Sequence, residues 1–219
     1  MFYLGFAIFF SILLIKQLFF RNIKSKITKG FDQKYTVALV ILIIITMWLG
    51  TAQWRFEYFL TKTALAISAN PKASVRCTTP ISELFEDSVG IYRDGWAYPK
   101  TGEIVIRYGW CKALKQYIKD PYSVNGRDKY ALLLFTHEVM HITGYENGID
   151  VHNEQLTECR AIQHVHLTAE AMGLPIEKVK NDTIFFFHND YLRHPYFSNN
   201  CGPGKSLDVS IEGSIFNSI

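Results

Sequence analysis

The hydrophobic positions of this chain are concentrated in two uninterrupted stretches near its start. Residues 35–52 (YTVALVILIIITMWLGTA) form 18 positions without a charge, and a helix of that length crosses the hydrocarbon core of a bilayer. Residues 1–20 are as apolar but contain Lys16, so they either span the membrane with the lysine reaching the interface or lie along it. We favour a second span, and residues 1–55 are predicted to form a membrane anchor.

In residues 56–219, polar and apolar residues alternate over short intervals, as they do in a folded domain. Alternating positions predict one β-hairpin, with strands at 96–98 and 103–108. Helical periodicity predicts the other main elements, which are helices within 56–75 and at 111–118, 128–143, 153–172 and 176–197. The third of these would start at Asp128 as its cap and stop at Gly144. The prediction is a mainly α fold, α+β with a small hairpin or sheet, preceded by transmembrane helices.

Charge along the chain predicts an orientation. Residues 1–52 contain six basic residues and one acidic residue, whereas the following residues contain 17 basic and 19 acidic ones. Because basic loops stay on the cytoplasmic side, the loop 21–34 is expected in the cytoplasm and residues 56–219 outside it. The slightly acidic domain has no basic stripe for nucleic acid. We predict a cell-membrane protein with an extracytoplasmic domain.

The cysteines agree with that compartment. All four, Cys77, Cys111, Cys159 and Cys201, follow the anchor, and an even number suits two disulfides in an oxidising environment. The sequence does not choose among the three pairings, and four buried free thiols are the alternative.

A metal-binding motif lies in the helix predicted over 128–143. Residues 136–146 read THEVMHITGYE and contain HExxH, with His137, Glu138 and His141. Histidines four apart share one face of a helix, so both imidazoles can bind one zinc ion. The glutamate beside the first histidine can then take a proton from the water that zinc activates and pass it to a leaving amine. This chemistry is peptide-bond hydrolysis.

The next predicted helix supplies carboxylates. It begins NEQLTECRA, with Asn153 as its cap and with Glu154 and Glu158 four apart on one face. Here the chain resembles the gluzincin zinc metallopeptidases, thermolysin-like enzymes in which a glutamate on a later helix completes the site. The resemblance implies a helical zincin-like domain with Glu154 as third ligand and Glu158 supporting His137. The family usually has an aspartate where Glu158 stands.

Other assignments stay open at this point. Glu158 could be the third ligand instead, with Glu154 favoured by the helix dipole. A metzincin-like spacing through Gly144 would place the third ligand at Asn147, a poor zinc donor. Donors to the transition state are expected among four residues, namely His152, His188, Tyr191 and His194.

We therefore expect a membrane-anchored zinc peptidase whose partners are a peptide or protein substrate and the lipid bilayer. Such enzymes place a β-strand edge beside the active-site helix, and residues 103–108 would pair there with an extended substrate, or would only cover the helix. The alternative is a non-catalytic, membrane-tethered binding domain in which the HExxH helix is structural or vestigial.

Overall fold

The computed structural model describes residues 2–23, 29–88, 94–124, 126–148, 150 and 152–219. Contacts within the chain divide it into two units, Met1–Phe56 and Glu57–Ile219. Helix α2 contributes residues to both units, because it runs without interruption over Lys29–Ser68. Each unit is described by itself below.

The first unit is helical. It contains α1 (Phe2–Ile23) and the first part of α2. Among the described residues, one helix is long and apolar enough to cross a membrane: the segment Thr36–Ser68 of α2, with a mean hydropathy of 2.0 in its most apolar window. Large apolar side chains along it, such as Ile44 and Trp48, are exposed. The apolar part of α1 is shorter, Gly5–Lys16.

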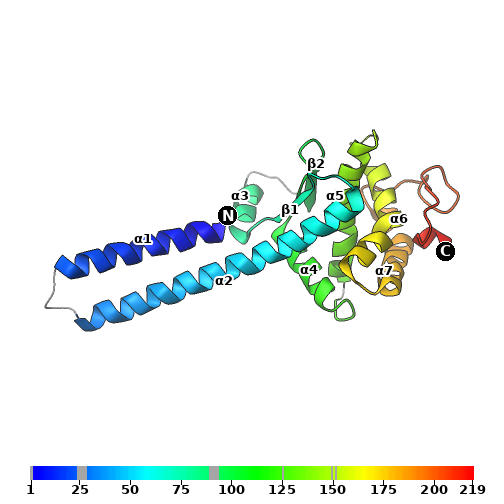
Figure 1. The fold of residues 1–219 in the computed structure, drawn as a ribbon. Helices are drawn as coiled ribbons and strands as arrows, with labels where there is room; N and C mark the ends of the chain where they lie inside the picture. The colour runs from blue at the N-terminus through cyan, green and yellow to red at the C-terminus, as the bar shows by residue number, and fades with distance from the viewer. Residues whose placement is uncertain (1, 24–28, 89–93, 125, 149, 151) are drawn as a thin grey trace. The chain divides into compact units, whose positions relative to one another are not determined.

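The second unit is mainly helical with a small sheet, which confirms the predicted fold class (Figure 1). Its elements after α2, in chain order, are β1 (Ser74–Cys77), α3 (Pro80–Ser88), β2 (Gly95–Tyr98), β3 (Glu103–Ile106), α4 (Tyr108–Lys119), the 3₁₀ helix η1 (Gly126–Tyr130), α5 (Ala131–Glu146), α6 (Glu154–Met172), α7 (Ile176–Asn189), and the 3₁₀ helices η2 (Tyr191–Arg193) and η3 (Ile215–Asn217).

The sheet has three strands in the order β1-β3-β2. The predicted hairpin is confirmed, since β2 pairs antiparallel with β3 from Gly95 opposite Ile106 to Tyr98 opposite Glu103. The sequence reading missed β1, which pairs parallel with β3 and has only four residues beside a turn signal at Pro80. The sequence analysis expected the strand at 103–108 to form an edge of the sheet, and this expectation is wrong. This strand, β3, is the central one.

The two edges of the sheet differ. At the β1 edge, the backbone N–H groups of Val75 and Cys77 donate to side chains of α2, the Thr61 hydroxyl and the Glu57 carboxylate, each at 2.9 Å. At the other edge, no further strand pairs with β2 in the described part of the chain. The open edge of this sheet is therefore β2.

The α5–α6 pair forms the centre of the unit. Helix α6 begins as predicted, because the Asn153 side chain accepts from the Leu156 N–H at 3.0 Å, and it ends at Gly173 with φ 69°. Two predictions for α5 are wrong. Asp128 does not cap it, because Asp128 lies within η1 and Tyr130 is the residue that precedes the helix. The helix also continues through Gly144 to Glu146, because a helical glycine costs only about 1 kcal/mol.

Two further helix boundaries differ from the sequence reading. Helix α7 ends at Asn189 instead of residue 197, because the chain turns into η2 and then an irregular segment. Helix α4 starts at Tyr108, three residues earlier than predicted.

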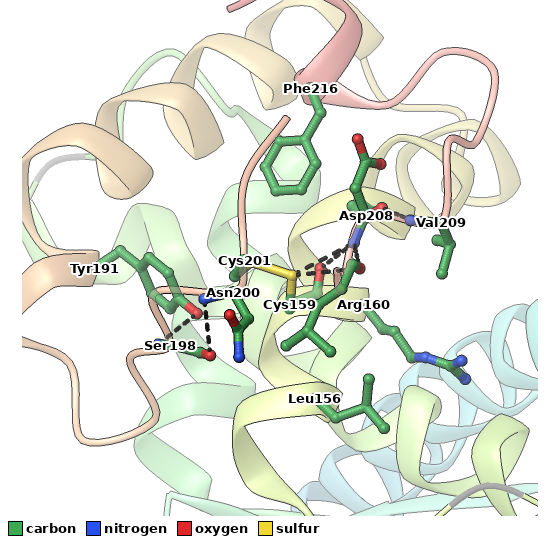
Figure 2. The surroundings of a disulfide bond; sticks show 12 residues. Leu156, Cys159, Arg160, Tyr191, Ser198, Asn200, Cys201, Asp208, Val209 and Phe216 are labelled. Atoms are coloured by element: carbon green, nitrogen blue, oxygen red, sulfur yellow. Dashed lines mark hydrogen bonds between the residues drawn. A yellow bond between two sulfur atoms is a disulfide. The ribbon is translucent and has the colours of Figure 1, made fainter. Parts of the chain in front are cut away.

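All four cysteines form disulfides, which confirms that part of the sequence reading. Cys77 of β1 is joined to Cys111 of α4, and Cys159 of α6 is joined to Cys201 after η2. Figure 2 shows the second disulfide between α6 and the C-terminal segment. Two such bonds suggest an oxidising environment for this unit.

Candidate metal centre

The HExxH motif lies on α5, on the side packed against α6. Its two histidines are buried, at 4% exposed for His137 and 7% for His141. Their Nε2 atoms lie 3.1 Å apart, which the four-residue helical spacing allows. The Glu154 carboxylate at the start of α6 lies 3.0 Å from Nε2 of His137 and 3.3 Å from Nε2 of His141. The three ligand atoms lie within 4.8 Å of one another and could hold a metal ion.

Glu158 lies on the other side of the first histidine ring. Its Oε2 atom is 2.6 Å from Nδ1 of His137, so Nδ1–H can donate to this carboxylate, and Nε2 is then the ring nitrogen that can bind a metal ion. A carboxylate in this position fixes the tautomer and orientation of a ligand histidine. The structure therefore brings Glu154 into the group with both Nε2 atoms and leaves Glu158 behind one ring.

Electrostatics at the centre favour a cation. Burial alone would lower the pKa of His137, but the hydrogen bonds to Glu154 and Glu158 outweigh it and raise that pKa to about 10. Burial opposes ionisation of Glu154, but hydrogen bonds to His137 and His141 hold its pKa well below the usual range. Two carboxylates around two imidazoles thus stabilise positive charge, whether it is a proton or a metal ion.

Glu138 lies next to the first histidine, buried and 4% exposed. Its Oε2 atom has no hydrogen-bond partner within the described residues. Burial raises the pKa of Glu138 to about 7, although the charges of His137 and His141 oppose this. A buried carboxyl oxygen without a hydrogen bond is costly, and a functional role is one reason why a protein keeps such a group. At neutral pH this group can gain or lose a proton.

A cavity of about 1060 Å³ lies at the candidate metal centre. It is lined by all three candidate ligands and Glu138, by β2 at Gly95, Trp96 and Ala97, by Trp110 of α4, by Phe186 of α7, and by the segment 193–196. The open edge strand and the HExxH helix therefore lie at the same cavity. Its volume exceeds what a metal ion needs and leaves room for a ligand of several residues.

Tyr196 is a cavity residue that the sequence reading missed. Its ring stacks on that of His137, with centroids 5.5 Å apart and an angle of 19° between the planes. The segment that contains Tyr196 is joined to α6 by the disulfide between Cys201 and Cys159. Within this segment, the Ser198 N–H donates to the Tyr191 hydroxyl at 3.2 Å (Figure 2). No sequence pattern marks Tyr196, because its contact with His137 joins segments that are far apart in the sequence.

The four predicted donor residues separate into two groups. His152 and His194 line the cavity. His188 is exposed beside Phe187, and Tyr191 is buried under the segment after η2; neither lines the cavity.

The metzincin-like alternative is not supported. The Asn147 amide donates to the Thr143 carbonyl at the end of α5, at 2.9 Å, and Asn147 does not line the cavity that His137 and His141 line. No protein-family model, curated protein or solved structure matches this chain.

Proposed function

We propose that this chain is a membrane-anchored zinc peptidase of the gluzincin type. One observation carries the proposal: two imidazole nitrogens and one carboxylate oxygen converge within 4.8 Å, beside a buried glutamate with an unpartnered oxygen. Structural polar clusters normally satisfy their members. A group of polar residues that leaves Oε2 of Glu138 without a hydrogen bond at a large cavity fits a catalytic role better.

The donor set fits zinc. Two histidine nitrogens and one carboxylate oxygen are the ligands of a three-residue catalytic zinc site, and the buried carboxylates offset the charge of the ion. His137, His141 and Glu154 would hold the metal, and Glu158 would orient His137 through its 2.6 Å hydrogen bond. When bound, zinc polarises a carbonyl and lowers the pKa of water to about 7.

Glu138 would act as general base and then as general acid. Its carboxylate takes a proton from the attacking water and delivers it to the nitrogen of the cleaved peptide bond. Without a metal ion, burial raises the pKa of Glu138 to about 7, and the charge of a bound zinc ion would lower it from there and favour the carboxylate form that accepts the proton. His152 and His194, which line the cavity, are the candidates for donating to the developing oxyanion.

The open strand β2 supports a peptide as substrate. The Arg107 N–H donates to the Asp94 carbonyl, so residues 94, 96 and 98 direct their backbone groups to β3 and the intervening Gly95 and Ala97 direct theirs to the open edge. An extended peptide can add to this edge as a further strand. Both edge residues line the cavity at the candidate metal centre.

The apolar segment of α2 and the two disulfides support an extracytoplasmic position for this unit. The basic loop 21–34, part of which lies outside the described residues, would then be cytoplasmic. The substrate would therefore be a peptide or protein outside the cytoplasm.

The experiment compares the full-length wild type with Glu138→Gln in detergent, using a synthetic peptide library as substrate. The variant should bind one zinc ion per chain and hydrolyse no peptide, because the ligands remain and the base is lost. Glu170→Gln is the matched control, because Glu170 is exposed on α6 and is not among the candidate ligands or cavity residues. A wild type that binds zinc but cleaves no peptide would instead favour a non-catalytic binding domain.

A further inference from the structure

Gly95, the first residue of β2, packs directly against the side chain of Glu138. A Cβ atom at this position would lie 2.9 Å from Oε1 of Glu138 and 3.2 Å from both Cδ and Cγ. These distances are shorter than ordinary contacts between non-bonded atoms. Gly95 does not have a positive φ, so the backbone conformation there does not itself require glycine. What requires it is the space that the Glu138 side chain occupies.

The carboxylate, and not the strand, would move if a side chain were added. Gly95 is held in the sheet, since it pairs with Ile106 and the flanking Asp94 carbonyl accepts from the Arg107 N–H at 3.1 Å. The far end of Glu138 is held less firmly, because its Oε2 has no hydrogen-bond partner in the described part of the chain. A methyl group at residue 95 would therefore displace the carboxylate and leave the sheet in place.

We propose that Gly95 is a positioning residue: the missing side chain at the start of the open strand leaves the space that keeps the Glu138 carboxylate beside the metal ligands. This inference rests on the proposed function, because the position matters if Glu138 transfers the proton. Gly95 would also connect substrate binding with catalysis, because its backbone groups face the open edge of β2 and the residue contacts Glu138, the proposed general base.

The test uses the full-length protein with Gly95→Ala. Gly109→Ala is the matched control, because Gly109 is exposed on α4 and an added Cβ meets nothing within 4 Å. On a library peptide that the wild type cleaves, G95A should keep its zinc and its KM but lose about 100-fold or more in kcat, the range for removing a general base. G109A should match the wild type in all three.

A second measurement does not depend on turnover. With cobalt in place of zinc, the absorption spectrum of G95A should resemble that of Glu138→Ala, because in both variants the carboxylate has left the metal site, and G109A should resemble the wild type. If the wild type cleaves no peptide, the proposed function fails, and the cobalt spectra still test the position of Glu138.

Two results would overturn the inference. One is a wild-type kcat and cobalt spectrum for G95A. The other is a fall in the unfolding temperature on G95A that is equally large in the E138A background, where the added methyl has no carboxylate to displace. That second result would mean that glycine serves the strand itself.

Discussion

His137 contacts two carboxylates through its two ring nitrogens: Nδ1 lies 2.6 Å from Oε2 of Glu158, and Nε2 lies 3.0 Å from Oε2 of Glu154. The two glutamates start from the same helix, one turn apart, and reach opposite sides of one ring. The exposed fractions of their side chains differ accordingly, at 6% for Glu158 and 41% for Glu154. The buried glutamate supports the ring, and the one at the cavity is available to a metal.

Changing each glutamate should therefore have a different effect on metal affinity. Glu154→Gln should abolish stoichiometric zinc binding, because it removes a ligand. Glu158→Gln should weaken zinc affinity about 10- to 100-fold, the usual cost of losing a partner of a ligand histidine. A competition titration with a chromogenic chelator measures both. The reverse order of effects would make Glu158 the ligand.

The open edge of β2 can be tested by removing one backbone donor. Ala97→Pro deletes an N–H that faces away from β3, and proline is tolerated on edge strands. Since a hydrogen bond contributes about 1 kcal/mol, KM for a cleaved peptide should rise about fivefold. Ala97→Gly keeps the N–H and is the control. An unchanged KM for the proline variant would show that the substrate does not pair at this edge.

The Cys159–Cys201 disulfide should stabilise both the fold and the segment that contains Tyr196. Its sequence separation is 42 residues, and the double change to alanine should cost about 2–4 kcal/mol in free energy of unfolding. Limited proteolysis should then cut faster within residues 190–201. The double alanine variant of Cys77 and Cys111 should lose stability without that new cleavage. Cleavage at equal rates in both variants would argue against the role of the disulfide in holding Tyr196.

His166 should make the stability of the protein depend on pH. The ring is buried under Gly213, and burial, with the charge of Lys180, lowers the pKa of His166, as burial also does for His164. The folded state thus disfavours the protonated ring. The contribution of the neutral ring to the stability of the protein is fully present above about pH 6.5 and decreases as the pH falls below that value.

Between pH 7.5 and pH 5.0, the unfolding temperature of His166→Gln should therefore decrease less than that of the wild type. Part of the wild-type decrease should remain, because His164 is also shifted in the same direction. Equal decreases in the variant and the wild type would exclude His166 as a source of the pH dependence.

Local patterns in the sequence predicted much of this fold. The hairpin, the capping of α6 by Asn153 and its end at Gly173 depend on short-range rules of alternation and capping. Strand β1 was not predicted, because four residues are too few to show a clear alternation of polar and apolar positions. Its hydrogen bonds are made with Glu57 and with β3, which are distant in sequence.

The same division applies to the site. Helical spacing predicts that His137 and His141 share a face, and that Glu154 and Glu158 do so on the next helix. Which glutamate faces the Nε2 atoms depends on how α5 and α6 pack, which no local pattern contains. The stack of Tyr196 on His137 and the fit of Glu138 against Gly95 arise from contacts between distant segments.

The central claim, a catalytic zinc centre on the HExxH helix, is tested most directly by elemental analysis of the full-length protein purified without added metal. The wild type should contain one zinc ion per chain, and the double variant His137→Ala/His141→Ala should contain none. A wild-type protein that is folded, retains both histidines and binds no stoichiometric zinc, even after zinc is supplied, would contradict the account.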